Sequence, residues 1–314
     1  MPTSGETTTT GHLSRIREHY VVRNLLGALS LMIEDKSTMA YLGFLILVLL
    51  MGLVGPSLAP YQYDETQRDE NGEIIRSAPP SLDHPLGTTD RGLDVLSRIM
   101  VGARPTVITG LLGGSLIIGI GMFVGITAGY VGGVVDDVLM RITDVAYGVP
   151  LIPFAIVLVT VIGVGFIQSV VVIGLLLWRG SARVLRSQVL QIKERPFILA
   201  AEASGASKTR IVVKHILPNV ATMAILFFTL GIGYSIILQA GLAFIGVSSP
   251  FVPSWGIMLR NAYNSGLMST AWWWSITPGL LIGLTVLSTF MFGRGYERVA
   301  GQTDEGEGAL VQAG

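Results

Sequence analysis

The chain has 314 residues, of which 50% are hydrophobic and 13% are charged, and its formal net charge at pH 7 is zero. A soluble domain carries about 25% charged residues, so this composition indicates a polytopic membrane protein. The absence of cysteine excludes disulfides, thiolate metal sites and a cysteine nucleophile, and the balanced charge gives no sign of nucleic-acid binding.

Residues 1–38 are polar and are expected to form an N-terminal segment in the cytoplasm. Apolar residues between Leu13 and Met32 recur at helical spacing with arginines among them. This pattern fits an interfacial helix and equally a loosely ordered tail. The first apolar run begins near Met39 without a clean cleavage site at its end, so we interpret it as a retained membrane anchor and not a signal peptide.

Six apolar segments are candidates for membrane-spanning helices, each of which needs about 20 residues. They cover residues 39–60, 106–130, 142–163, 166–178, 220–246 and 272–292. The fourth is short, and it either continues through residues 180–182 or packs inside the bundle. We therefore expect an all-α fold, a polytopic membrane helix bundle with about six transmembrane helices.

Glycines in the second span recur every four residues. They stand at Gly121, Gly125 and Gly129, and the same spacing separates Gly110 from Gly114. Small residues at this spacing let helix backbones approach closely. The second span is therefore expected to pack tightly inside the bundle.

The distribution of lysine and arginine predicts how the bundle is oriented. Residues 179–219 carry eight lysines or arginines against two glutamates. This loop is expected in the cytoplasm, and six spans then place both termini there. The loops at 61–104, with eight acidic residues against five arginines, and at 247–271 are expected outside. The tryptophans at 272–274 are interpreted as an aromatic anchor at the outer interface.

The loop at 183–219 has the features of two short helices joined by a turn. Its first part is rich in helix formers and ends near Gly205, because glycine readily adopts the left-handed conformation that ends a helix. Ser207 can cap a second helix that includes Arg210, and Pro218 is tolerated in the first turn of the next span. These residues alone leave two interpretations open: a surface that docks onto a partner, or a solvated basic loop.

Several short motifs stand in colinear order between residues 84 and 298. They are His84-Pro85-Leu86-Gly87-Thr88, Leu96-Ser97-Arg98, Gly102-Ala103-Arg104, residues 129–144, residues 182–189, Gly205-Ala206-Ser207, residues 210–219 and residues 253–259. Together they resemble the second membrane subunit of the peptide and nickel family of ATP-binding-cassette importers, the "C" type of dipeptide and oligopeptide permease. The resemblance implies the helix bundle of a type I importer permease with a cytoplasmic coupling helix.

The same resemblance implies a transport role in the cell membrane. The loop at 183–219 would dock onto a separate ATPase subunit and pass its movement to the spans as alternating access. The implied coupling residues are Ala200, Ala201, Glu202, Gly205, Ala206, Ser207, Arg210, His215 and Pro218. The family motif usually opens Glu-Ala-Ala, whereas here Leu199 stands first and Glu202 follows three residues later.

The resemblance also implies partners and cargo. The partners are a homologous second permease, two cytoplasmic ATPase subunits and an extracytoplasmic solute-binding protein. The cargo is a peptide or a related small solute, with nickel or sugar as further possibilities. The chain then divides into a cytoplasmic segment (1–38), a first anchor (39–60), an extracytoplasmic loop (61–104), a permease core (105–298) and a disordered cytoplasmic tail (299–314).

No catalytic, cofactor or metal site is expected in the chain itself. It has no Gly-Lys pair, so it lacks the phosphate-binding loop of an ATPase, and its four histidines are not spaced as metal ligands. The alternative function is a stand-alone ion-coupled transporter or channel. The predicted spans are nearly free of ionisable residues, which argues against it; Asp144, Gln168 and Gln239 are the polar groups it would use.

Overall fold

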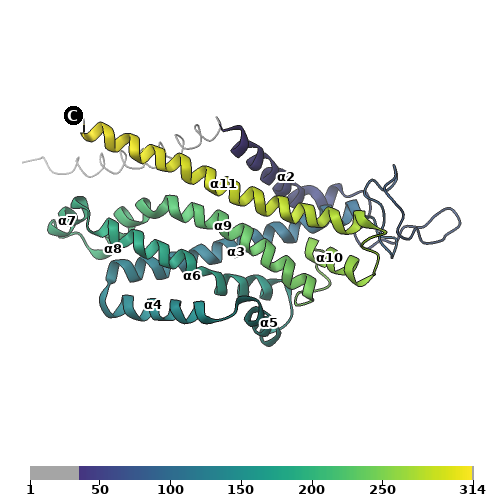
Figure 1. The fold of residues 1–314 in the computed structure, drawn as a ribbon, viewed down its shortest axis with the longest axis horizontal. Helices are drawn as coiled ribbons and strands as arrows, with labels where there is room; N and C mark the ends of the chain where they lie inside the picture. Colours follow the sequence, from purple (N-terminus) through teal and green to yellow (C-terminus); the bar gives the residue numbers. More distant parts are fainter. Residues whose placement is uncertain (1–34, 313–314) are drawn as a thin grey trace, which may run out of the picture.

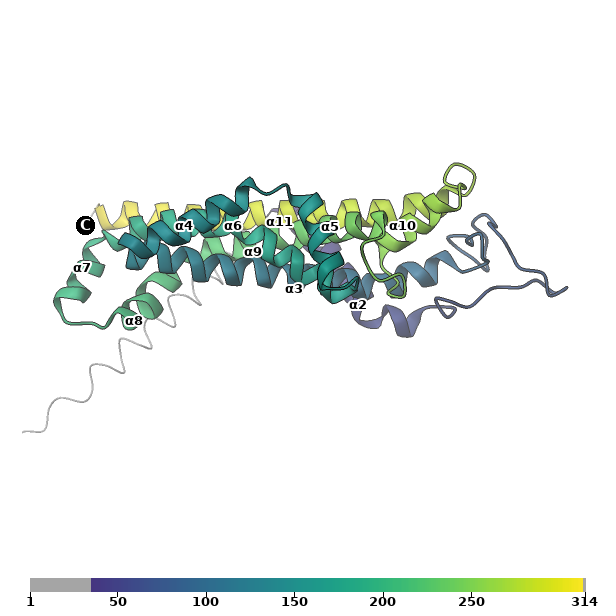
Figure 2. The same ribbon diagram turned by 90° about the horizontal axis from the view of Figure 1, so that it is seen from below.

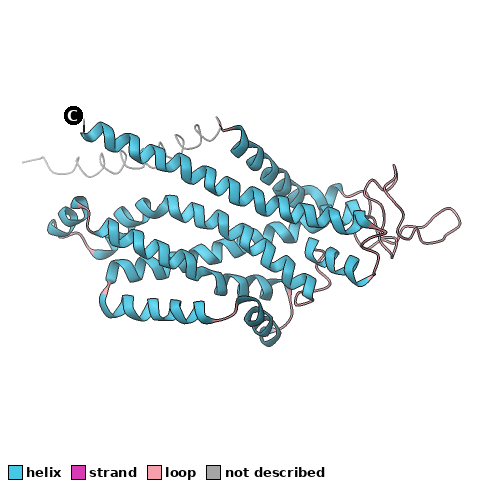
Figure 3. Ribbon diagram, in the orientation of Figure 1, coloured by secondary structure: helices cyan, strands magenta, loops and turns pink. Residues whose placement is uncertain are grey.

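The computed structural model describes the backbone of residues 35–312 and the side chains of residues 35–298, and all regular elements in this part of the chain are helices (Figure 3). The possible interfacial helix within residues 1–34 lies outside the described residues. The elements are α2 (Lys36–Leu58), α3 (Val95–Val131), α4 (Gly133–Gly148), α5 (Leu151–Ile162), α6 (Phe166–Lys193), α7 (Pro196–Ala203), α8 (Lys208–Ile211), the π-helix η1 (Val212–Ile216), α9 (Leu217–Ile245), α10 (Trp255–Asn264) and α11 (Trp272–Gln312). The expected all-α fold is confirmed.

Most helices run along the long axis of the molecule (Figures 1 and 2). One end carries α7 and α8, and the other carries α10 and the loop at 59–94; they are named the α7 end and the α10 end. The central helix is α3, which packs against α6, α9 and α2. Helix α2 runs toward the α10 end, and α11 packs against α2 and α9 as it returns to the α7 end (Figure 1).

The predicted third span is not one helix. Among the described residues, five helical runs are long and apolar enough to cross a membrane, and α4 and α5 form a sixth only as a pair bent by 97°. Val149, between them, is extended with φ −87° and ψ 126°. The ring of Pro150 disfavours helical backbone at the residue before it, so the helix ends there. The prediction of about six spans is confirmed, with the third broken in the middle.

Three helices are longer than the sequence predicts. Helix α3 begins at Val95 because the Asp94 carboxylate caps it, accepting a hydrogen bond of 2.8 Å from the Ser97 backbone N–H. Helix α6 continues to Lys193 and is a full-length span. Helix α11 continues to Gln312, so residues 299–312 are helical where a disordered tail was expected. No proline follows Pro278 to end that helix.

Close backbone approach holds α3 against two neighbours, as its glycines predict. A Cβ atom on Gly125 would lie 2.5 Å from the carbonyl oxygen of Ala182 on α6, and one on Gly129 would lie 2.9 Å from a carbonyl oxygen further along α6. Gly110 and Gly114 approach side chains and backbone of α9 in the same way. Backbone atoms cannot move aside as side chains do, so the expected tight packing is confirmed.

At the α10 end, the loop at 59–94 is held by buried polar contacts. His84 Nδ1 lies 2.9 Å from Asp94 Oδ1, and the indole N–H of Trp273 donates to the backbone oxygen of Thr88 at 3.2 Å. Trp273 is therefore buried, as is Trp274, whereas Trp272 is 51% exposed. The aromatic-anchor interpretation is wrong for Trp273 and Trp274, because the loop covers this end of α11 and they form part of the core.

Candidate functional site

The candidate coupling segment, residues 183–219, includes α7 and α8, which project at the α7 end (Figures 1 and 2). The single helix expected to run up to residue 203 is broken. Helix α6 ends at Lys193, Arg195 is extended with φ −70° and ψ 143°, and α7 starts at Pro196. The reason is again the proline, which disfavours helical backbone at the residue before it and favours the first position of a new helix.

The turn after α7 has the geometry that its glycine predicts. Gly205 has φ +77°. Its N–H donates to the Glu202 carbonyl at 2.9 Å, and the Ala206 N–H donates to the Ala201 carbonyl at 3.1 Å. These two bonds form a Schellman motif, in which the residue after the helix adopts a left-handed conformation. The turn fixes the direction in which the chain leaves α7.

The second short helix starts as predicted but does not end before the next span. The Ser207 hydroxyl accepts a hydrogen bond of 3.4 Å from the Arg210 backbone N–H and caps α8. The chain then passes through η1 into α9 without a break, and Pro218 lies in the first turn of α9. Proline has no N–H for an intrahelical bond. At the next residue, the side-chain amide of Asn219 donates to the backbone oxygen of His215 at 2.6 Å.

Three isoleucines anchor the segment to the bundle. Ile198 of α7, Ile211 of α8 and Ile216 of η1 are each 0–1% exposed. They belong to one core cluster with residues of α3, α6 and α9: Tyr130, Leu185, Val189, Ile192 and Val220. Buried aliphatic side chains of this kind stabilise a segment by about 1.5–3 kcal/mol each. The segment is therefore attached to three spans at once.

The outer surface of the segment exposes apolar side chains beside basic ones. Phe197, Leu199 and Val213 are 40%, 54% and 54% exposed. The exposed basic residues nearby are Lys208, Arg210 and Lys214. Exposed apolar side chains that are rimmed by polar residues mark interaction surfaces.

The nine residues implied to couple all lie in this one segment. Five are exposed: Ala200, Glu202, Gly205, Ser207 and Arg210. Four are half-buried: Ala201, Ala206, His215 and Pro218. Within the described residues, no three histidine or acidic side chains are placed to hold a metal ion. The arrangement presents a surface of exposed and half-buried side chains that projects from the bundle.

A set of ion pairs between α4 and α6 was not predicted. Arg186 donates two hydrogen bonds of 2.5 Å to Asp136, and Arg183 Nη2 lies 2.7 Å from Asp144 Oδ1. Arg179 donates to the backbone oxygen of Ala146 at 2.8 Å. The sequence analysis used these arginines for orientation and for the family resemblance and did not assign partners to them, although the spacing of three and four residues between 179, 183 and 186 places them on one helix face.

A stand-alone ion-coupled transporter would use Asp144, Gln168 and Gln239, but the structure does not bring these three side chains together. The Asp144 carboxylate is paired with Arg183. The Gln239 side chain is buried and donates to the Ser248 hydroxyl at 3.4 Å, and Gln168 is exposed. The three do not form a common site, and their contacts do not favour this alternative.

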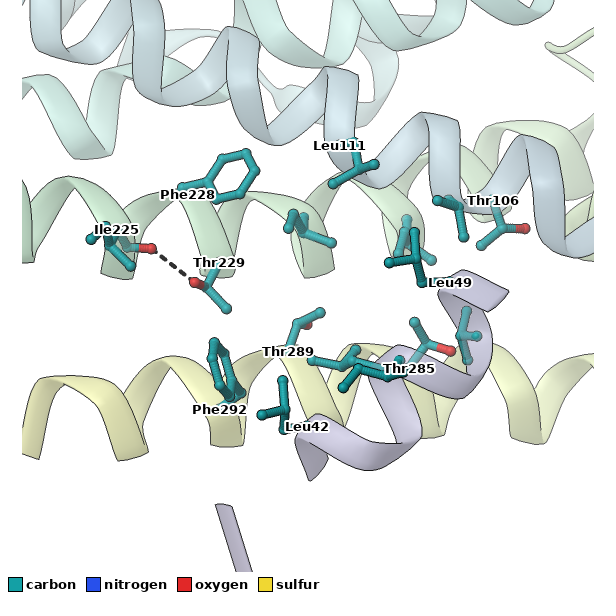
Figure 4. A pocket seen from close by; sticks show the side chains of 16 residues that line it. Leu42, Leu49, Thr106, Leu111, Ile225, Phe228, Thr229, Thr285, Thr289 and Phe292 are labelled. Atoms are coloured by element: carbon teal, nitrogen blue, oxygen red, sulfur yellow. Dashed lines mark hydrogen bonds between the residues drawn. The ribbon is translucent and has the colours of Figure 1, made fainter. Parts of the chain in front are cut away.

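An apolar cavity of about 360 Å³ lies between α2, α3, α9 and α11 (Figure 4). Four threonines line it, and each donates its hydroxyl to a backbone oxygen within its own helix; they are Thr106, Thr229, Thr285 and Thr289. The other lining residues are aliphatic or phenylalanine. The cavity therefore suits hydrocarbon and offers little to a polar solute.

Two family models and several known proteins are similar to this chain over the helices described above. Residues 121–298 match the family model described as binding-protein-dependent transport system inner membrane component, and residues 32–80 match the N-terminal TM domain of oligopeptide transport permease C. The dipeptide transport system permease protein DppC of Bacillus subtilis is 34% identical over 84% of this chain and 81% of its own length. The oligopeptide transport system permease protein OppC of Haemophilus influenzae is 31% identical over 83% of each chain. The glutathione transport system permease protein GsiD of Escherichia coli is 35% identical over 80% of this chain and 82% of its own.

Proposed function

Because the chain belongs to the binding-protein-dependent transport system inner membrane component family, we propose that it forms half of a passage for peptides and that residues 183–219 couple this passage to ATPase subunits. The family makes the chain a permease subunit of an ATP-binding-cassette importer, with ATP hydrolysis in separate subunits. The named cargoes of its relatives, dipeptides, oligopeptides and glutathione, are all peptides. Peptides are therefore the cargo class that we assign to it.

The observation that supports the coupling role is an exposed apolar surface on a segment that is firmly packed against the bundle. Burial of Phe197, Leu199 and Val213 in a partner groove contributes about 25 cal/mol per Å² of apolar surface removed from water. Glu202 and Arg210, both exposed, supply charges that fix the register of docking. Because Ile198 and Ile211 are packed among α3, α6 and α9, a displacement of α7 moves the spans with it.

The charge distribution supports one orientation. The α7 end carries the exposed basic residues of the segment, and basic loops stay in the cytoplasm. Helix α11 ends at the α7 end and α2 leads away from it (Figure 1), so both termini are assigned to the cytoplasm. The α10 end then faces outward, where the loop at 59–94 is available to a solute-binding protein.

The test is recovery of the whole assembly. The chain is tagged, extracted from native membranes in mild detergent and purified, and the proteins that come with it are identified by mass spectrometry. The expected result is a homologous permease, two ATPase subunits and a solute-binding protein, which together give ATP-dependent uptake of a peptide in liposomes. Recovery of this chain alone, moving solute without ATP, would overturn the proposal.

A further inference from the structure

Helix α2 approaches the bundle closely at two places, and the apolar cavity of Figure 4 lies between them. Toward the α10 end, α2 lies against α3, where a Cβ atom on Gly55 would be 2.7 Å from the Met100 carbonyl oxygen. Toward the α7 end, α2 lies against α11, where a Cβ atom on Gly295 would be 2.5 Å from Thr38 Oγ1. The part of α2 between these contacts forms one wall of the cavity, and α3, α9 and α11 form the others.

The cavity lies at the depth of the membrane hydrocarbon. Its lining residues all fall within four stretches of the chain, which are 37–58 on α2, 105–131 on α3, 217–245 on α9 and 272–293 on α11. Each stretch is free of charged residues and has the length of about 20 residues that is needed to cross the hydrocarbon core. The medium around these stretches is therefore the acyl chains of the bilayer.

The cavity opens between α2 and α3 and has an apolar wall. Its exposed lining side chains are Ile46, Leu49 and Leu111, which are 46%, 39% and 43% exposed. Among the residues that the structure places around the cavity, none is charged. The four threonine hydroxyls already donate to backbone oxygens of their own helices. A polar ligand would lose its hydration here without gaining new hydrogen-bond donors, so the ligand that fits is a hydrocarbon.

The dimensions of the cavity suit one hydrocarbon chain. Its lining on α9 extends from Ile225 to Ile236, which is a length of about 16 Å at 1.5 Å per residue. A volume of about 360 Å³ over this length gives a mean cross-section of about 22 Å². A helix about 10 Å wide has a cross-section of about 80 Å² and does not enter such a space. A single chain does, because carbon atoms pack at about 4 Å from one another.

We propose that this acyl-chain cavity binds one acyl chain of a bilayer phospholipid, which enters between α2 and α3. The bound chain supplies the packing contacts that the lining side chains lack on their open side. It thereby supports the part of α2 that touches neither α3 nor α11 closely. The site is independent of the cargo and of the coupling role.

The test is photolabelling with a phosphatidylcholine that carries a diazirine group in one acyl chain. The full-length chain, together with the subunits that copurify with it, is placed in liposomes containing this lipid and irradiated, and the labelled residues are identified by mass spectrometry. Thr229 and Thr289 line the cavity and are 5% and 1% exposed, so only a chain inside the cavity reaches them. They are expected to be labelled at least tenfold more than Ile173 of α6, which is 0% exposed and does not line the cavity. Leu53 of α2, 66% exposed, reports labelling by the surrounding bilayer.

A pair of variants on α2 tests whether the label enters through this cavity. Leu45→Trp, at a lining position, places an indole in the cavity and is expected to lower labelling of Thr229 and Thr289 at least fivefold. The matched control is Leu47→Trp, at a position that is 55% exposed and outside the lining, and it should change this labelling less than twofold. Equal labelling in the two variants would overturn the proposal. So would wild-type labelling of the two threonines no stronger than that of Ile173, or labelling seen only in the isolated chain, which would show that another subunit fills the cavity.

Discussion

Arg186 of α6 and Asp136 of α4 form a two-pronged ion pair, in which Nε and Nη2 each donate to one carboxylate oxygen at 2.5 Å. Paired parallel hydrogen bonds between a guanidinium and a carboxylate fix the orientation as well as the distance of the two groups. Helix α4 is the first half of the broken span, and α6 leads directly to the coupling segment. The pair therefore links the first half of the broken span to the helix that leads to the candidate coupling segment.

Removing either partner of this pair is expected to destabilise the bundle. Asp136→Asn or Arg186→Gln leaves a mostly buried charge without its partner, at a cost of about 1–3 kcal/mol, between the values for exposed and buried pairs. Thermal unfolding of the purified chain in detergent measures the loss. Glu194→Gln, at an exposed position beyond the end of α6, serves as the control and should leave the midpoint unchanged. Recovery of the midpoint in the double swap Asp136→Arg with Arg186→Asp would identify the pairing as the cause; equal midpoints for all variants would contradict it.

A second prediction concerns the contact between α3 and α6. Gly125→Ala adds a methyl group 2.5 Å from the Ala182 carbonyl oxygen, whereas a Cβ atom on Gly119, in the same helix, meets nothing within 4 Å. Gly125→Ala is expected to cost about 1–3 kcal/mol through overpacking, and Gly119→Ala is expected to stabilise the helix slightly. The midpoints of thermal unfolding of both variants in detergent measure these changes in stability. Similar melts for the two would mean that α3 and α6 can separate without loss.

The sequence was informative wherever a local rule decides the structure. The glycine spacing on α3, the left-handed turn at Gly205 and the cap at Ser207 depend on a few neighbouring residues, and the structure has all three. The break at Pro150 does not follow from the sequence alone, because a proline inside a span is tolerated or breaks it according to the packing around it.

Features that depend on distant segments could not be predicted in the same way. The burial of Trp273 depends on a hydrogen bond to Thr88, far away in the chain. The pairing of Arg186 with Asp136 depends on α4 folding back along α6. One sequence shows the charges but does not show which helices meet. For the same reason, the bounds of the loop at 183–219 could be predicted from the sequence, whereas the ion pairs between α4 and α6 required the structure.

Substitutions at Gly205 test whether coupling depends on the backbone conformation of the turn after α7 or on side-chain contacts made there. A Cβ atom on Gly205 would meet nothing within 4 Å, so only its φ of +77° restricts substitution. Gly205→Val is expected to strain the turn by about 1–2 kcal/mol or more and to uncouple ATP hydrolysis from uptake. Gly205→Asn is expected to keep most of the coupling, because asparagine tolerates the left-handed conformation. The ratio of solute moved to ATP hydrolysed in liposomes measures this. Equal ratios for the two variants would show that the shape of the turn is unimportant.

The exposed apolar side chains of α7 give a prediction about docking itself. Replacement of Phe197 and Leu199 together by serine removes apolar surface that is outside the core. The chain should fold normally, and the amount of ATPase recovered with it should fall at least tenfold, since a loss of about 1.4 kcal/mol is a factor of ten. Val164→Ser, at a position 53% exposed between α5 and α6, is the control and should retain the ATPase.

Ile198→Ala provides the contrast: it lies in the core at 0% exposure and should lower the melting temperature through a cavity costing about 2–5 kcal/mol. Full recovery of ATPase with the double serine variant would place the docking surface elsewhere on the α7 end.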